Sequence, residues 1–282
     1  MIYLILAVLT STLIIITFRL FERFHISTLQ AITVNYLVAS AFGYLSFGRQ
    51  PGFSEITSQP WFLFALIIGV TLIVSFNLFA LSARFAGVSV TAISSRMSVI
   101  IPVILGFIAF GDTAGWIKIT GIVVALVAFY FTSKKDKKVH LNVKYAYLPV
   151  FLFAAVGLND SLMKVAEHYF IHGDFVLFLA TAFGVALILG VVVLMIKGKN
   201  EKFAFRNVIA GIVLGLLNWY STLYFLKGIS LFQVSFFVPV YNVGVVALAS
   251  ATGFILFTER PTTSKLAGIG LALIAIFLIA NG

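Results

Sequence analysis

The sequence contains no cysteine, and charged residues make up only 10% of its 282 positions. Without cysteine, a disulfide scaffold, a thiolate metal site and a cysteine nucleophile are all excluded. Soluble domains carry charge on about a quarter of their residues, whereas 61% of this chain is hydrophobic. A water-soluble chain could not hide so much apolar surface, so the composition predicts an integral membrane protein that is partnered by the lipid bilayer.

Motifs of several enzyme classes are also missing. The chain has no HExxH zinc-protease motif, no P-loop and no GxSxG nucleophile motif. Its histidines fall in expected loops or at expected helix ends, and His168 and His172 are four residues apart without an evident third ligand. We therefore expect no enzyme activity, no metal, no cofactor and no transport that this chain drives by ATP hydrolysis.

The net charge of +10 does not predict nucleic-acid binding, because the basic residues lie in short loops between apolar runs rather than in a stripe with aromatics. Of the 19 Lys and Arg residues, 14 lie in loops on one side of the expected membrane and 4 on the other, and Arg96 lies inside an apolar run. The more basic side, which includes the loop 134–144, is expected in the cytoplasm. The chain is then a multi-pass protein of the cell inner membrane with both termini outside.

Ten apolar runs are long enough to cross the hydrocarbon core as helices, which takes roughly 20 residues. They cover about Ile2–Leu20, Thr28–Phe47, Trp61–Ala83, Val88–Phe110, Gly115–Thr132, Tyr145–Ala166, Phe175–Ile196, Phe205–Leu226, Ile229–Phe257 and Thr262–Ala280. Five runs precede the lysine cluster at 134–138 and five follow it. The expected fold class is all-α, a polytopic membrane protein with ten transmembrane helices.

An internal repeat is indicated when the chain is shifted by 147 positions. Residues 110–132 then match residues 257–279 at seven of 23 positions without a gap, including Lys118 with Lys265 and Gly121 with Gly268. Asp112 meets Glu259, and an acid before a helix is expected to cap the helix that follows it. Chance similarity between two apolar helices is the alternative, which the matched charges and glycine disfavour.

The predicted repeats divide the chain into a first five-helix half over 1–133, a basic linker over 134–144 and a second five-helix half over 145–282. Because five crossings is an odd number, the second half must insert upside down relative to the first. Inverted repeats of this kind are common in secondary transporters, where two related halves move about a site near the middle of the membrane. The repeat is therefore the strongest link from this sequence to function.

The chain resembles the EamA-type members of the drug/metabolite transporter superfamily, which have ten helices in two halves. The likeness rests on the run 86–92, Pro102, Gly111-Asp112 and Gly121 in the first half, and on Lys227-Gly228-Ile229-Ser230, Pro239, Thr258-Glu259-Arg260-Pro261 and Gly268 in the second. Pro102 lies ten positions before its acid and Pro239 twenty before its acid, so the two prolines are not equivalents. The resemblance implies a transporter, since the family includes exporters of amino acids and other metabolites, with a central cavity lined by helices of both halves.

Arg96 is the clearest candidate site residue, because it lies eight residues beyond Val88 and thus about 12 Å into its helix. It either faces a cavity and attracts a carboxylate or other anion, or it is a structural arginine bonded to carbonyls or a neighbouring acid. Asn159 and Asp160 form a second candidate group. Asp160 accepts a proton or a substrate amine, or it forms a self-neutralising pair with Lys164 four residues later.

Further candidates are polar or amphipathic side chains inside the expected helices. Asn218, Trp219 and Tyr220 suit either a pocket of mixed polarity or helix packing. Tyr241 and Asn242, two and three residues after Pro239, mark an expected break where an amide can bond a ligand or a freed carbonyl. Asn77 is a candidate for the cavity or for an interhelical hydrogen bond.

These observations predict a secondary transporter that exports a small polar metabolite such as an amino acid by alternating access. Proton coupling and uncoupled transport both remain open, as do a monomer and a homodimer. The alternative function is that of an intramembrane enzyme or lipid-handling protein without solute transport. For such an enzyme, Arg96 and Asp160 are the only ionisable pair the sequence suggests.

Overall fold

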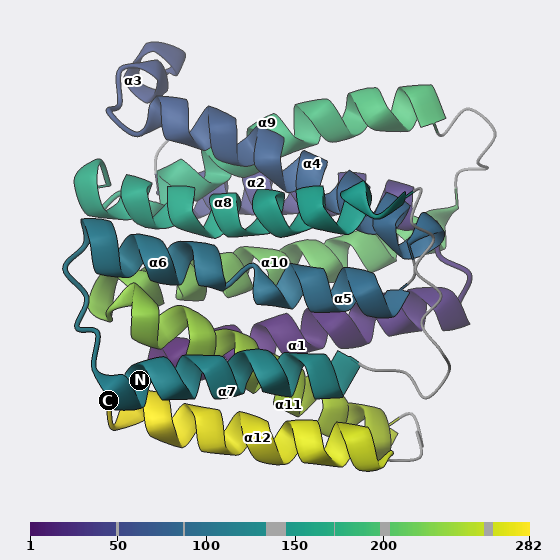
Figure 1. The fold of residues 1–282 in the computed structure, drawn as a ribbon. Coiled ribbons are helices and arrows are strands. Elements are labelled where there is room, and N and C mark those ends of the chain that lie inside the picture. Colours follow the sequence, from purple (N-terminus) through teal and green to yellow (C-terminus); the bar gives the residue numbers. More distant parts are fainter. Residues whose placement is uncertain (49–50, 87, 134–144, 172, 198–203, 257–261) are drawn as a thin grey trace. The chain divides into compact units, whose positions relative to one another are not determined.

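The computed structural model describes residues 1–48, 51–86, 88–133, 145–171, 173–197, 204–256 and 262–282. Within these residues the regular secondary structure is helical throughout (Figure 1). The helices are α1 (Ile2–Arg23), α2 (Thr28–Ser46), α3 (Phe53–Thr57), α4 (Phe62–Phe85), α5 (Val88–Met97), α6 (Ile100–Ala109), α7 (Trp116–Ser133), α8 (Tyr147–Tyr169), α9 (Phe175–Lys197), α10 (Phe205–Leu231), α11 (Val234–Leu256) and α12 (Thr263–Ala280). The predicted linker 134–144 and Glu259 lie outside the described residues.

Eight helical stretches within the described residues are long and apolar enough to cross a membrane. They are α1, α4, α8, α9, α10, α11 and α12, together with Val90–Ala109, which joins most of α5 to α6. The helix over Trp116–Thr132 is apolar but shorter. Large apolar side chains such as Ile108, Leu45 and Ile255 are 76–80% exposed, which water would not tolerate over so wide a surface. The chain is therefore an all-helical, polytopic membrane protein.

The predicted single run Val88–Phe110 is in fact two helices, because α5 ends at Met97 and α6 begins at Ile100. Pro102 is the physical cause. It has no N–H to give to the carbonyl of Ser98, and its ring clashes with that carbonyl. Ser98 lies in the turn, and its carbonyl instead accepts from the N–H of Ile101 at 3.0 Å. The break thus occurs one turn before the proline.

Two other predictions of helix boundaries need correction. The break between the eighth and ninth runs was expected before Ile229, whereas α10 continues to Leu231 and α11 begins at Val234. Gly228 is buried and does not end the helix, since an isolated glycine in a helix costs only about 1 kcal/mol. The break expected at Pro239 is not present, because α11 continues through this proline from Val234 to Leu256. The short helix α3 was not predicted.

The chain forms two compact units, of which unit 1 comprises Met1–Ile73 and Val165–Ser230. Glycines let its helices approach closely. A Cβ at Gly69 in α4 would lie 2.6 Å from Cβ of Val185 and 2.7 Å from the carbonyl of Ala182, both in α9. In unit 1 the rings of Tyr36 in α2 and Phe183 in α9 also stack, with centroids 6.2 Å apart. Helix backbones in unit 1 therefore come into close contact at glycines, which have no side chain.

A second close contact in unit 1 repeats the first one. A Cβ at Gly215 in α10 would lie 2.7 Å from Cβ of Val38 and 2.8 Å from the carbonyl of Asn35, both in α2. The pairs α4 with α9 and α10 with α2 thus share one pattern, a glycine set against a valine and against the carbonyl three residues before that valine.

Unit 2 comprises Val74–Lys164 and Leu231–Gly282, and in it α7 and α12 lie side by side (Figure 1). Gly121, early in α7, faces Ile279, late in α12, while Gly268, early in α12, faces Thr132, late in α7. The two helices are therefore antiparallel. Each unit draws on helices from both predicted halves of the chain, so the halves over 1–133 and 145–282 are not separate compact bodies.

Candidate functional site

Arg96 lies at the last turn of α5 in unit 2, where it hydrogen-bonds across to α11. Its Nη1 donates to Oδ1 of Asn242 at 2.9 Å. Asn242 is buried, and its Nδ2 donates to the carbonyl of Val238 at 3.0 Å, one turn earlier in the same helix. Because the amide nitrogen is held by the backbone, the amide oxygen is directed at the guanidinium. Asn242 is thus a hydrogen-bond partner of Arg96, and the orientation of its amide group is fixed by the backbone of α11.

Asp160 in α8 brings a negative charge to the same place. Asp160 and Tyr241 lie close enough to Arg96 to interact with it electrostatically, and the side chain of Asn159 hydrogen-bonds Asp160. Gly157, three residues before Asp160, permits this approach, because a Cβ there would lie 2.8 Å from the carbonyl of Ser98 in the turn after α5. The break in the helix at Ser98 and the glycine in α8 thus position the two charges.

The predicted alternative of a self-neutralising Asp160–Lys164 pair on one helix leaves out a charge that another helix contributes. Lys164 is 8% exposed, and its Nζ lies 5.6 Å from the centroid of the Phe110 ring. Asp160 has a cation of another helix, Arg96, within electrostatic reach. The carboxylate therefore belongs to an interhelical group.

The structure brings together five of the predicted site residues from three helices of unit 2. These are Arg96, Asn159, Asp160, Tyr241 and Asn242, which we call the Arg96 cluster. It joins a guanidinium, a carboxylate, two amides and a phenol. Such a group can bind the two charges of a small polar molecule, hold its hydroxyl or amide groups, and exchange a proton at the carboxylate.

The other candidates lie apart from these five in the chain. Asn77 is half-buried in the part of α4 that belongs to unit 2. Asn218, Trp219 and Tyr220 belong to unit 1, where Trp219 is 1% exposed and packs against Phe42 with ring centroids 6.2 Å apart. A Cβ at Gly43 would lie 2.5 Å from the Trp219 ring, so the contacts of Trp219 favour packing. A role in lining a cavity remains a prediction for all four.

Asp112 was expected to cap α7, the helix that follows it, and it instead caps α11. Its Oδ2 accepts from the backbone N–H of Ser235 at 2.7 Å. The first N–H groups of a helix have no partner within that helix, and a carboxylate bonded there is also stabilised by the positive end of the helix dipole. The partner lies 123 residues away, so no local sequence signal could have identified it.

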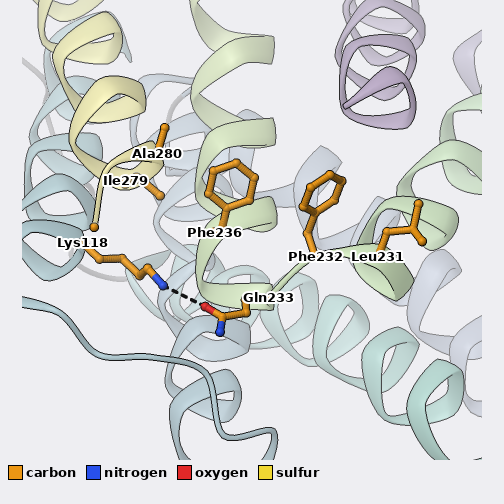
Figure 2. Close-up of a pocket in the computed structure, with 8 residues that line it drawn as sticks. Lys118, Leu231, Phe232, Gln233, Phe236, Ile279 and Ala280 are labelled. Atoms are coloured by element: carbon orange, nitrogen blue, oxygen red, sulfur yellow. Dashed lines mark hydrogen bonds between the residues drawn. The ribbon is translucent and has the colours of Figure 1, made fainter.

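Lys118 was matched with Lys265 in the predicted repeat but was not predicted as a site residue, because it was counted among the loop charges. It is 4% exposed, and its Nζ donates to Oε1 of Gln233 at 2.8 Å and to the carbonyl and Oγ1 of Thr113. Figure 2 shows Lys118 and Gln233 at the edge of a pocket of ≈ 380 Å³. The pocket is lined by Lys118, Leu231, Phe232, Gln233, Phe236, Ile279, Ala280 and Gly282, all of unit 2.

Among the described residues, no group of three or more His, Asp or Glu side chains could hold a metal ion.

Comparison with known proteins identifies a relative by sequence and a solved structure with a similar fold. No family model matches it. A curated protein of Haemophilus influenzae, described as an uncharacterized protein, is 28% identical over 290 residues, which cover 98% of this chain and 96% of that protein. A solved structure, described only as the crystal structure of a protein, matches with a TM-score of 0.80 over 99% of this chain and 96% of that chain. At 12% identity, the latter likeness shows the fold alone.

Proposed function

We propose that this protein is a secondary transporter of the drug/metabolite transporter superfamily that binds a small polar metabolite such as an amino acid and exports it across the membrane. The observation that carries the proposal is the Arg96 cluster inside a bundle of apolar helices. A charge at the centre of a membrane helix costs about 3 kcal/mol on insertion scales, and such residues usually face a cavity or a transport route. Arg96 and Asp160 lie on α5 and α8, which both belong to apolar spans.

The cluster has the two charges that a zwitterion requires. The guanidinium of Arg96 would bind a carboxylate of the cargo through a pair of N–H donors, which is the arrangement that arginine favours. Asp160 would accept a substrate amine or a proton, and Tyr241 and Asn242 would orient the remaining polar groups. When no cargo is bound, Asn242 hydrogen-bonds the arginine and the nearby Asp160 offsets part of its charge.

The proposed architecture is ten crossings in two inverted five-helix repeats, and the glycine contacts support it. Gly121 and Gly268 are 147 positions apart, as are Thr132 and Ile279, and Gly121 faces Ile279 while Gly268 faces Thr132. The two contacts exchange partners, as they do across a two-fold axis. In unit 1, Tyr36 and Phe183 are also 147 positions apart, and they stack on one another.

The two-fold relation between contacts also applies to the Arg96 cluster. Arg96 and Asn242, which are 146 positions apart, are each the ninth residue of their helices, α5 and α11. Gly69 and Gly215 are likewise 146 positions apart, and their valine partners Val185 and Val38 are 147 apart. The hydrogen bond between Arg96 and Asn242 therefore joins equivalent positions of the two proposed repeats. Inverted-repeat transporters bind their cargo at the interface between their two repeats.

The proposal is tested by reconstituting the protein into liposomes and measuring the flux of a panel of labelled amino acids and other small metabolites, with and without a pH gradient. We expect flux of at least one solute above that of protein-free liposomes. An effect of the pH gradient separates proton-coupled from uncoupled transport. If no solute in a broad panel moves, and lipid is instead scrambled or modified, the intramembrane lipid-handling alternative replaces transport.

The proposed topology predicts which added thiols react from which face of the cell. The chain has no cysteine, so the thiol of a single introduced cysteine is labelled without background from native cysteines. We expect Arg23→Cys and Lys137→Cys to react only after the membrane is made permeable, and Ser54→Cys to react with an impermeant thiol reagent on intact cells. Reaction of Ser54→Cys and Lys137→Cys from the same face would rule out the proposed arrangement.

A further inference from the structure

The pocket at the start of α11 is connected to the Arg96 cluster by a stack of aromatic rings. Phe232 lines the pocket, and its ring stacks on Phe237 with centroids 6.3 Å apart and planes 13° apart. The ring of Phe237 in turn stacks on Tyr241 at 6.1 Å and 4°. Phe237 is completely buried, and Tyr241 is part of the cluster. The stacked rings therefore make a continuous chain of contacts from the pocket to the cluster.

The start of α11 is held by hydrogen bonds from the segment between α6 and α7 and from the first turn of α7. Asp112 accepts from the N–H of Ser235 at 2.7 Å, and Lys118 donates to Gln233 at 2.8 Å. Thr113 and Gln233 are also bonded, with their side-chain oxygens 3.1 Å apart. We call the Asp112–Ser235 and Lys118–Gln233 bonds the latch. Both bonds involve a charged group, and such bonds are roughly twice as strong as neutral ones.

A proline separates the latched turn from the cluster. Pro239 lies inside α11, four residues after Ser235 and three before Asn242. Proline has no N–H for the carbonyl of Ser235, and its ring clashes with that carbonyl, so the helix is weakened at this point. In addition, the buried hydroxyl of Ser235 has no hydrogen-bond partner among the residues that the structure describes. Residues 234–238, which we call the gate segment, are thus fixed at their start by the latch and only weakly joined to the rest of α11.

We infer that the pocket is the outer end of a route to the Arg96 cluster, that the gate segment closes this route with Phe237, and that the latch of Asp112 and Lys118 keeps it closed. The inference rests on the proposed transport function, since it assigns a path to the same site. Breaking the latch lets the gate segment pivot at Pro239 and withdraws Phe237 from the stack. Cargo entering from the pocket then meets Tyr241 and Asn242 first.

The test uses thiol reactivity, which does not depend on any cargo. Asn242→Cys in the full chain serves as the reporter, in lipid nanodiscs where both membrane faces are accessible to a water-soluble thiol reagent. We expect the reporter to react slowly alone and about tenfold faster with Asp112→Ala, the factor that corresponds to losing one charge-assisted hydrogen bond. Phe237→Ala is expected to accelerate the reaction at least as much, because it removes the ring that closes the route.

A second variant displaces the latch without removing its charge. A Cβ at Gly106 would lie 2.6 Å from Oδ2 of Asp112, so Gly106→Ala pushes the carboxylate away from Ser235 and is expected to act like Asp112→Ala. Glu22→Ala and Phe277→Ala are the matched controls, since Glu22 is an exposed acid and Phe277 is a 67% exposed ring. Both controls should leave the reporter rate unchanged.

Unchanged reporter rates in Asp112→Ala, Gly106→Ala and Phe237→Ala would overturn the inferred gate, even if the liposome experiment demonstrates transport. Faster reaction in these three variants but not in the controls supports the gate, even if no solute in the panel moves. Equal acceleration in the controls would mean general loosening of the bundle and would also overturn the gate. The two proposals therefore fail by different measurements.

Discussion

Replacing Arg96 with alanine is expected to abolish transport of any cargo that carries an anionic group, while the yield of folded protein stays largely unchanged. Removing the guanidinium removes a charged hydrogen bond worth up to about 3 kcal/mol, which corresponds to a loss of flux of about 100-fold. The measurement is initial flux into liposomes, normalised to monodisperse protein recovered by gel filtration. Arg84→Ala is the control, since Arg84 is an exposed arginine at the end of α4.

The Asp160 carboxylate makes a second variant necessary. In Arg96→Ala it loses the cation of α5 and becomes a less compensated charge inside the bundle, which by itself destabilises the fold. The double variant Arg96→Ala with Asp160→Asn removes both charges, so we expect it to recover any folded yield lost in the single variant but not the flux. If Arg96→Ala fails to fold and the double variant regains both yield and flux, Arg96 is a structural residue.

Enlarging Gly69 or Gly215 to valine is expected to destabilise the protein strongly and by similar amounts. A Cβ at either position would lie 2.6–2.8 Å from a valine side chain and a backbone carbonyl, so the helices must separate. Overpacking of this kind costs about 1–3 kcal/mol. The midpoint of thermal unfolding in detergent, read by loss of monodisperse protein, should fall equally in the two variants, because the two contacts have the same pattern.

Gly270→Ala is the control for these substitutions. Among the described residues, no atom beyond the neighbouring backbone of α12 lies within 4 Å of a Cβ at Gly270, and alanine favours a helix over glycine by about 1 kcal/mol. Its unfolding midpoint should be unchanged or slightly higher. A large drop in Gly69→Val with none in Gly215→Val would contradict the equivalence of the two contacts and weaken the proposed repeat.

The sequence predicted the helices well, because apolar runs of membrane length are a local signal. It predicted less well where a helix breaks. Pro102 was noted within a single run, yet the break falls at Ser98 and Val99, since a proline disrupts the carbonyl four residues earlier. The continuation of α10 to Leu231 was missed because Gly228 resembles a breaker but is tolerated inside a packed helix.

The candidate site could be predicted residue by residue but not as a group. Arg96, Asp160 and Asn242 were each identified as costly polar groups in apolar runs. Their contact joins residues 146 positions apart, and it depends on the break at Ser98 and the close approach at Gly157. Asp112 is a second example. From the local sequence it is expected to cap the helix that follows it, and its role as a cap of α11 depends on how the helices pack.

The proposed repeat is indicated in the sequence only over the last helix of each half, where charged and glycine positions match. Tyr36 and Phe183 are different residues, yet they stack at positions related by the same shift of 147. Arg96 and Asn242 also differ, and they occupy equivalent places in their helices. In the proposed repeat, helix packing at these positions requires only a suitable shape or a small residue, so corresponding positions can carry different amino acids and still make corresponding contacts.

The most direct measurement of the central claim is counterflow. Liposomes containing the protein are loaded with a high concentration of unlabelled cargo, and the uptake of trace labelled cargo is followed over time. A carrier that alternates access about the Arg96 cluster predicts a transient overshoot of label above its equilibrium value, which disappears in Arg96→Ala. Uptake that rises to equilibrium without an overshoot, and that is the same in the wild type and in Arg96→Ala, would contradict the account.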